Sequence, residues 1–461
     1  MLTAARRLAR DRRGELLMIP ALAGACLLSA LSAFAAYGDQ PFVVPGLVLA
    51  AMLMLVTLAR AAVGVAVGIA LYPLGVLGFI GQPGWAAATA WTVLLFGLAI
   101  VRRVDRIPLR ASRSLMLPIL GVLVVALISL AASGEVAEAL PVLRSTAAGA
   151  MLYVAIITFV TTRTSVAWVL GVLTLVGLLV GGLAVWQFAS GRGGDVGFFT
   201  GSGALVTRVA AGFEQPNQLA GFLVMLVPFL IAALILRVPA RWLGAAALVV
   251  AVTGIVLTFS RSALVALLVV PLFFLRVRWT LVLAPFAAVL LVLSAPDVLT
   301  ERFSTLSADG TDIATRVDFW RAGITIFVEH PLLGVGPGGY AEAYSEARLP
   351  GKQFLPGTLF EPPPHAHNLL INTGAEQGLL GLSALVALIA GALAVAGRAR
   401  IGSTIWAVTL GRAGLGSTAA FLIHNSFDVT LLETTGTVFL ALLGLVTAAA
   451  GLVADESRRD G

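Results

Sequence analysis

Long apolar segments recur from one end of this chain to the other, and no other feature restricts its fold so strongly. An apolar run of about 17 residues or more can cross a bilayer as a helix, and such runs follow one another through the 461 residues. Only 11% of the residues are charged and the mean hydropathy is +0.99, whereas soluble proteins have about 25% charged residues. A soluble core cannot accommodate so many apolar segments. We therefore predict an all-α polytopic membrane protein.

The apolar segments predict about 12–14 transmembrane helices. The candidates are residues 16–36, 43–59, 62–80, 85–101, 115–133, 146–162, 165–188, 218–236, 242–259, 262–275, 279–295, 377–397, 403–424 and 434–453. Further spans follow the first one directly, which argues against a signal peptide. We divide the chain into an N-terminal transmembrane bundle of about 11 spans (1–295), one long external loop (296–376), and C-terminal transmembrane helices with a short cytoplasmic tail (377–461).

The basic residues indicate how these spans are oriented. Arginines gather near the N-terminus, at Arg6, Arg7, Arg10, Arg12 and Arg13, and the positive-inside rule assigns that segment to the cytoplasm. When the spans alternate from there, the other arginine-rich loops also fall inside and most acidic residues fall outside. We therefore expect both termini to be cytoplasmic and all four histidines to face outward. The net charge of +7 arises from these loops, so we do not expect binding to nucleic acid.

The long external loop contains a pattern typical of an amphipathic helix. Its apolar residues recur at spacings of three and four, at Ile313, Val317, Trp320, Ile324 and Phe327. This periodicity predicts a helix that lies in the membrane interface, with Trp320 at the depth of the lipid headgroups. A turn-rich segment from His330 to Tyr340 follows it. The three alternating glycines of that segment follow no predicted strand, so we do not interpret them as a nucleotide-binding loop.

The strongest chemical signal is His367-Asn368, followed after nine residues by Gly378-x-x-Gly381. An imidazole can accept a hydroxyl proton near neutral pH, so His367 is a candidate general base. The alternative is purely structural: an interfacial histidine, an asparagine that caps a helix, and glycines that allow close packing.

Two arginines lie near the predicted outer surface. Arg261 stands between two apolar segments, where a charged group is costly and is commonly functional; snorkelling to the interface is the alternative. Arg208 precedes the span that begins at residue 218, and its alternative is a solvated position in a loop. Two guanidinium groups beside one outward cavity would suit a diphosphate, because they form bidentate, charge-assisted hydrogen bonds.

The remaining polar residues of the outer side are expected to have supporting roles. His330 and His365 are interpreted as structural rather than catalytic. His424 and Asp428 end a span together and could form a hydrogen-bonded pair, while Glu376 is either a partner of the site or an ordinary interfacial carboxylate. The four histidines lack acidic neighbours at the spacing of metal ligands, so we predict no metal site.

Taken together, four segments resemble the signature set of the O-antigen ligase/polymerase superfamily of bacterial membrane glycan transferases. The segments are Arg208 to Asn217, the Thr-x-Ser-Arg that ends at Arg261, the His330-Pro331-x-x-Gly334-x-Gly336 turn, and His367-Asn368-x9-Gly-x-x-Gly. The resemblance covers roughly residues 200–430. It implies a glycosyltransferase C-type membrane fold that needs neither metal nor cofactor, in the bacterial plasma (inner) membrane.

The resemblance also implies a reaction and its residues. The donor would be an undecaprenyl-diphosphate-linked glycan, used on the outer face of the plasma membrane with inversion of the anomeric configuration. By position, His367 would be the catalytic histidine, and Arg208 and Arg261 would hold the donor diphosphate. Supporting positions would be Asn368, Asn217, Glu376, His424, Asp428, Arg316 and His330.

The sequence leaves several functions open. The motifs do not separate a ligase, which moves a finished glycan to a glycan or lipid-linked acceptor, from a polymerase or from a protein-glycosylating enzyme. A transporter or flippase of lipid-linked glycans is the alternative from another class. It would be expected to have polar groups near the bilayer midplane and inverted repeats, whereas Arg412 is the only charge deep within a predicted span. A scaffolding protein would need no constellation of external histidines and arginines.

Overall fold

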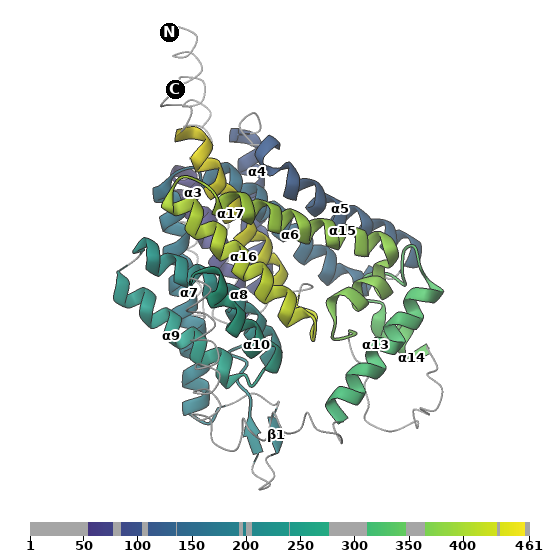
Figure 1. Ribbon diagram of the computed structural model, residues 1–461. Coiled ribbons are helices and arrows are strands. Elements are labelled where there is room, and N and C mark those ends of the chain that lie inside the picture. The colour runs from purple at the N-terminus through teal and green to yellow at the C-terminus, as the bar shows by residue number, and fades with distance from the viewer. Residues whose placement is uncertain are drawn as a thin grey trace, which may run out of the picture.

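The described residues fold as a helical assembly with one small strand pair (Figure 1). The computed structural model describes residues 54–76, 84–103, 109–134, 136–192, 197–199, 205–238, 240–275, 311–346, 365–430 and 434–456. Its elements are α3 (Ala61–Val76), α4 (Gly84–Arg103), α5 (Leu109–Ser133), α6 (Val136–Phe159), α7 (Arg163–Ala189), β1 (Gly197–Phe199), β2 (Leu205–Thr207), α8 (Pro216–Leu236), α9 (Arg241–Leu257), α10 (Arg261–Val269), the 3-10 helix η2 (Val270–Phe273), α13 (Thr311–Glu329), α14 (Tyr340–Glu346), α15 (Leu369–Arg400), α16 (Ile405–Asn425) and α17 (Thr434–Glu456). Strands β1 and β2 pair in antiparallel fashion, and β2 ends one residue before Arg208.

Six described helices are long and apolar enough to cross a membrane, namely α5, α6, α7, α8, α15 and α17. Shorter apolar helices coincide with four more predicted spans, at α3, α4, α9, and α10 together with η2. These helices confirm the predicted class, an all-α polytopic membrane protein. The predicted spans at 16–36 and 279–295, and most of 43–59, lie outside the described residues.

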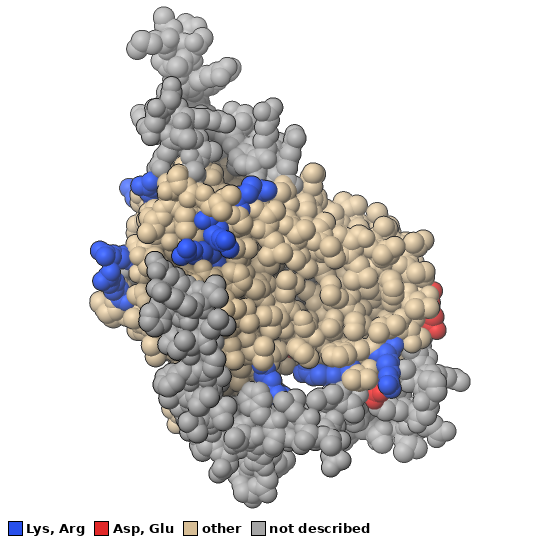
Figure 2. Space-filling model, in the orientation of Figure 1, with Lys and Arg blue, Asp and Glu red and all other residues tan. Residues whose placement is uncertain are grey.

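The surface of the bundle has the charge distribution of a membrane protein. On the face drawn in Figure 2, the described Lys and Arg side chains gather toward the ends of the molecule. A broad surface between them carries no charged side chain. Large apolar side chains such as Leu117, Trp168 and Val249 are exposed on the helices, as expected where lipid rather than water is the solvent.

Helix α16 occupies the centre of the C-terminal half and packs against α8, α15 and α17. Small residues allow this close approach, because Gly411 faces the main chain of Arg400 and Gly414 faces Ala396 and Val446. Such contacts between small residues are the usual means of packing helices within a membrane. The tight packing fixes the C-terminal end of α16, which carries His424.

The predicted helix of the external loop is present as α13, but its packed face differs from the predicted stripe. The buried residues of α13 are Phe319, Ala322 and Ile326, whereas Ile324 is 52% exposed. One face of α13 packs on α14 and α15. Two residues of the predicted stripe also lie against the rest of the protein, Phe327 beside Gly374 and Trp320 beside Phe427. Sequence periodicity missed the part of the packed face formed by Ala322 and Gly323, because these residues contribute little to an apolar pattern.

The turn that follows α13 is joined to a break in α15. Gly378 interrupts the helix with φ 62° and ψ −157°, a conformation that essentially only glycine adopts. The interruption frees main-chain groups, and the N–H of Leu379 donates to the carbonyl of Pro331 at 2.8 Å. The N–H of Gly336 donates to the carbonyl of Glu376 at 2.9 Å. Gly336 of the turn after α13 and Gly378 of α15 therefore lie at the same backbone contact. This contact supports the structural interpretation of Gly378.

Candidate functional site

His367 lies on a tight turn immediately before α15. Asn368 is the N-cap of that helix, and its side-chain oxygen accepts the N–H groups of Leu370 and Ile371 at 3.1 Å each. Within the turn, the N–H of Ala366 donates to the side chain of Asn372 at 2.9 Å. His367 itself adopts φ 49°, a left-handed conformation that is uncommon for residues other than glycine. The turn is thus held by side chains, and it presents the imidazole at the end of the helix.

A second segment, the 426–428 peptide, follows α16 and packs on this turn. Each of its three residues makes a contact. The carbonyl of Ser426 accepts the side-chain N–H of Asn368 at 3.0 Å, and the carbonyl of Phe427 accepts a guanidinium N–H of Arg316 on α13. Asp428 then faces His367. The predicted supporting residues Asn368 and Arg316 therefore hold the 426–428 peptide in place.

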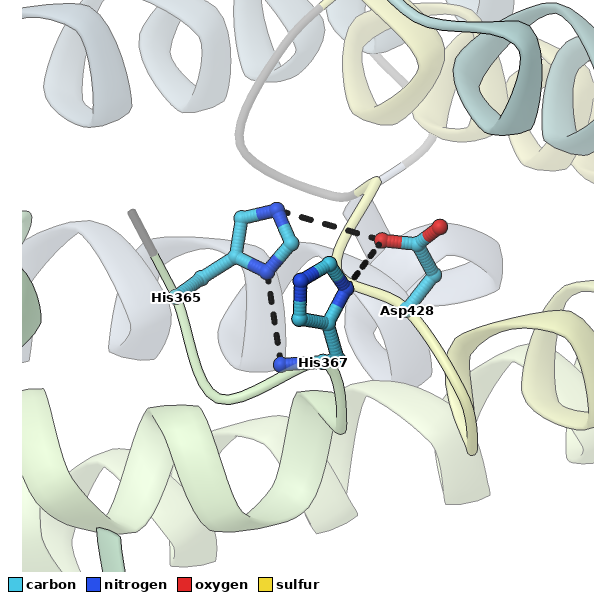
Figure 3. Close-up of side chains that lie close together, drawn as sticks. All are labelled: His365, His367 and Asp428. Atoms are coloured by element: carbon cyan, nitrogen blue, oxygen red, sulfur yellow. Dashed lines mark hydrogen bonds and ion pairs between the residues drawn. The ribbon is translucent and has the colours of Figure 1, made fainter. Parts of the chain in front are cut away.

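Asp428 forms the centre of a cluster with two histidines (Figure 3). Its Oδ1 lies 3.4 Å from Nδ1 of His367 and 3.8 Å from Nε2 of His365. The two imidazole rings lie 4.3 Å apart and nearly edge to face, with an interplanar angle of 71°. The Asp428 side chain is only 3% exposed, compared with 20% for His367. The carboxylate is therefore shielded, while His367 retains access from outside.

The cluster has a defined electrostatic character. Burial alone would raise the pKa of Asp428, but the adjacent His367 side chain and the other surrounding histidines hold this pKa well below its usual range. Burial and the neighbouring His367 lower the pKa of His365 to about 4. At neutral pH the cluster therefore contains an ionised Asp428 beside an uncharged His365.

The contacts of His367 determine what its ring can do. Nδ1 points at the carboxylate, so the proton of the neutral ring belongs on Nδ1 and the lone pair on Nε2. Phe319 of α13 stacks on the ring, with centroids 5.7 Å apart and an interplanar angle of 23°. The 3.4 Å separation between Nδ1 and Oδ1 of Asp428 is longer than a good hydrogen bond. This arrangement suits a base that accepts a proton on Nε2.

Arg208 is fixed by two hydrogen bonds. Its Nε donates to the carbonyl of Thr258, and one terminal nitrogen donates to the side chain of Asn217, each at 2.7 Å. Asn217 lies in the first turn of α8, and Thr258 follows the end of α9, three residues before Arg261. The sequence predicted Arg208, Asn217 and Arg261 as members of one site, and the fold brings their three segments together.

Arg261 is the first residue of α10. The N-cap of this helix is Ser260, whose side chain makes no capping hydrogen bond, and Phe259 before it has φ 52°. The positive end of a helix dipole therefore coincides with a guanidinium group. Both features favour an anion at this position.

His424 connects the arginine segments to the histidine cluster. It is completely buried, and its Nδ1 lies 3.0 Å from the hydroxyl oxygen of Ser262 on α10. Gly221 of α8 makes room for the ring, because a Cβ there would lie 2.9 Å from Nε2. The sequence suggested a hydrogen bond between His424 and Asp428. Instead His424 bonds to Ser262, and Asp428 faces the other two histidines.

Two predicted supporting residues lie apart from the cluster. His330 is exposed at the end of α13. Glu376 is buried in α15 at 1% exposure, close to the main chain of Gly338 and to the side chain of Asn372. Since Asn372 accepts the N–H of Ala366, Glu376 adjoins the packing beneath the turn of His367 rather than the reacting groups.

The histidine cluster also has the composition of a metal site. Potential ligand atoms of His365, His367 and Asp428 lie within 4.8 Å of one another. The prediction that there is no metal site was based on spacing along the chain, and that spacing could not anticipate an acidic residue supplied from beyond α16. Two histidines and one carboxylate could hold a divalent cation, so the absence of a metal stays a prediction.

Comparison with protein families identifies the region that contains this geometry. The family model described as O-antigen ligase matches residues 246–386. The match supports the resemblance to the O-antigen ligase/polymerase superfamily over this region of the chain. The matched O-antigen ligase region includes Arg261 and His367, while Arg208 precedes it and His424 and Asp428 follow it. No curated protein matches the chain.

Sequence reasoning missed three residues that the structure adds to the site. Phe319 stacks on the candidate base, Ser262 bonds to His424, and Asn372 holds the main chain of the turn. Only Asn372 had a sequence signal, since a polar residue in the first turns of an apolar helix suggests a nearby partner. The other two are an ordinary apolar residue and an ordinary serine, which a pattern cannot distinguish.

Proposed function

We propose that this protein is an inverting glycan transferase that moves saccharide from an undecaprenyl-diphosphate-linked donor to an acceptor hydroxyl. The observation that carries the proposal is the contact between His367 and Asp428, in a chain whose central region matches the O-antigen ligase family. The family supports a glycan ligase or polymerase type of function in the broad sense. The donor, the base and the direction of the site are parts of our proposal.

In the proposed reaction His367 acts as general base. The acceptor hydroxyl oxygen attacks the anomeric carbon, and its proton passes to Nε2 of His367 as the new carbon–oxygen bond forms. The bond between the anomeric carbon and the diphosphate oxygen breaks on the opposite side, which inverts the configuration. Asp428 stabilises the positive charge that develops on His367. The departing lipid diphosphate keeps the bonding electron pair, so no general acid is required.

The arginines are assigned to the leaving group. Negative charge grows on the diphosphate as the glycosidic bond breaks, and fixed guanidinium groups in a site of low dielectric stabilise that charge. Arg208 is oriented by Thr258 and Asn217, and Arg261 stands at the positive end of α10. His424 keeps α10 at a fixed position relative to the 426–428 peptide through Ser262.

We further propose that the protein lies in the bacterial plasma membrane with both termini in the cytoplasm and the site facing outward. The distribution of basic loops supports this orientation. Lipid-linked donors present their diphosphate at the membrane surface, so a site at the outer end of the bundle would meet the donor there. The acceptor would be a glycan or a lipid-linked molecule.

We infer that transfer is independent of metal, although the histidine cluster has suitable ligands. A cation in the cluster would bind Nδ1 of His367, the nitrogen that faces Asp428. The neutral ring would then carry its proton on Nε2, which could no longer accept the proton of the acceptor hydroxyl. Washing membranes with EDTA should therefore leave the rate of transfer unchanged. If EDTA abolished transfer and a divalent cation restored it, the cluster would be a metal site and the role of His367 as base would be wrong.

The function is tested by the length of lipid-linked glycans in a bacterial host deleted for this protein. The host is complemented with the wild type, with His367→Ala, or with Thr325→Ala, a change of an exposed residue on α13 as the control. Accumulation of single repeat units, relieved by the wild type and the control but not by His367→Ala, would identify a polymerase. Accumulation of full-length chains without their final acceptor would identify a ligase. An unchanged glycan pool would contradict glycan transfer and favour a transporter.

A further inference from the structure

His365 precedes the proposed base by two residues and contacts it in two ways. Its Nδ1 lies 3.3 Å from the main-chain nitrogen of His367 and accepts that N–H. Its ring also lies edge-on to the ring of His367, and its Nε2 faces Asp428 from 3.8 Å (Figure 3). With a side chain only 13% exposed, His365 fills the space between the turn and the 426–428 peptide.

The hydrogen bond to His365 is made by the N–H of His367, the residue that has the unusual backbone conformation. His367 adopts a left-handed conformation, which is unfavourable for a residue with a Cβ. A side chain that accepts the N–H of the second residue after it is the arrangement of an Asx turn, and here an imidazole nitrogen takes the place of the usual asparagine oxygen. Asn372 accepts the preceding N–H, of Ala366. The strained turn is thus held at two successive N–H groups.

We propose that His365 is a positioning residue for the transfer reaction: by accepting the N–H of His367 it holds the left-handed turn that aims Nε2 of His367 at the acceptor hydroxyl. The inference rests on the proposed function, because it needs His367 to be the base. It assigns His365 no contact with the substrate and no proton transfer.

The positioning role requires one protonation state and one tautomer. Nδ1 can accept the N–H only when it carries no proton, so the ring must be neutral with its proton on Nε2, directed at Asp428. The ionisable groups facing His365 are His367 on the same turn, Asp428 on the 426–428 peptide and Arg316 on α13. Burial, the neighbouring His367 and Arg316 favour the neutral ring, and Asp428 opposes them.

When His365 is neutral, the negative charge of Asp428 is not shared with it and can stabilise a positive charge on His367. If His365 were charged, it would share the single negative charge of Asp428 and repel the positive charge that forms on His367 during transfer. A neutral His365 avoids both effects. The same residue therefore fixes the geometry of the base and keeps the carboxylate available to it.

The test compares His365→Asn with His365→Ala in the full-length protein, in membranes of the deleted host. Asparagine restores an acceptor for the N–H two residues later, whereas alanine does not. Transfer from the lipid-linked glycan pool of the host is measured in spheroplasts between about pH 5 and pH 8, where a histidine of ordinary pKa titrates. His367→Ala is included, and the amount of each variant in the membrane is measured.

We expect His365→Ala to lower the rate about 10- to 100-fold, because a shift of about 1 Å in a reacting group can cost about 100-fold. His365→Asn should recover the wild-type rate to within about threefold. The pH at which activity falls on the acid side should not move in either variant. A His365→Ala variant as active as the wild type, with His367→Ala inactive, would overturn the positioning role alone. A shift of the acid limb in His365→Asn would also overturn it, by showing that His365 itself exchanges protons.

Two further outcomes are informative. An active His367→Ala would overturn the proposed base, and with it the inference about His365. If His365→Ala does not accumulate, His365→Gln provides the comparison, because its amide is one methylene too far out to close the turn. Equal rates for the Gln and Asn variants would then contradict the role of the hydrogen bond.

Discussion

The carboxylate of Asp428 lies 3.4 Å from Nδ1 of His367, although the whole of α15 and α16 separates the two residues in the chain. The ends of these two helices meet because α16 packs along α15 and the 426–428 peptide returns over the turn. A buried, ionised carboxylate beside an imidazole orients the ring and stabilises its protonated form.

Replacement of Asp428 by Asn should lower the rate of glycan transfer about 100-fold, within the range that positioned proton transfer contributes. The amide keeps the shape of the side chain but removes the charge that stabilises protonated His367. Asp318→Asn, on α13, is the matched control and should keep the wild-type rate. Transfer is measured from the lipid-linked glycan pool, and a fully active Asp428→Asn would exclude an electrostatic role.

Replacement of Arg261 by Lys should also lower transfer, by about 10-fold or more, because lysine cannot form the paired hydrogen bonds of a guanidinium group. Arg321→Lys, an exposed arginine on α13, tests whether arginine-to-lysine changes are harmful in general. A near-normal rate for Arg261→Lys would mean that a point charge is sufficient at the start of α10.

Acidification should destabilise the fold around the histidine cluster. The pKa of His365 is about 4 in the folded protein and 6.5 in the reference state, so the unfolded chain binds more protons between these values and stability falls as pH decreases through this window. The lowered pKa of Asp428 acts in the same direction below its reference value of 3.8.

Melting temperatures of the detergent-solubilised protein across about pH 4 to pH 7 measure this effect. The decrease on acidification should be smaller in His365→Asn, which removes one of the two groups. A melting temperature that is independent of pH, or that rises on acidification, would contradict the assigned direction.

Replacement of Gly378 by Ala should lower the melting temperature and the transfer rate together. The φ of 62° is unfavourable for alanine, and an added Cβ would lie 2.3 Å from the main chain of Leu332. We expect a loss of at least about 2 kcal/mol in the free energy of unfolding.

Gly397→Ala, in the same helix, is the control for this change. A Cβ at Gly397 meets nothing within 4 Å, and alanine favours a helix by up to about 1 kcal/mol. Its melting temperature should stay the same or rise. Equal effects at the two glycines would mean that the break in α15 has no particular importance.

Hydrophobicity alone predicted most of the helices that the structure describes. The start of α15 was predicted wrongly, for a physical reason. The sequence suggested a span from residue 377, whereas the helix begins at Leu369. Asn372, Glu376 and Gln377 interrupt the apolar pattern, and they are tolerated because they are buried against the turn that follows α13 rather than exposed to lipid.

The site was predictable in its residue types but not in its pairs. Arg261 stands out by the cost of placing a charge between two apolar segments. His367 stands out by its motif, and Arg208 by the resemblance to a known family. The partner of His367 could not be predicted, since nothing local connects residue 367 to residue 428. The sequence also favoured a structural role for His365 over a catalytic one. The geometry supports a structural role, because His365 accepts the N–H of His367, the proposed base.

The break in α15 has a consequence for the register of the chain. Nine residues separate Asn368 from Gly378, and the backbone contact with the turn after α13 fixes the lower end of that interval. A helix turns by about 100° and rises about 1.5 Å per residue. One residue inserted between Asn368 and Gly378 would therefore rotate the turn of His367 by about 100° around the helix axis and move it by about 1.5 Å along that axis, away from its present position beside Asp428. The number of residues in this interval, as much as their identity, determines where the imidazole of His367 stands relative to Asp428.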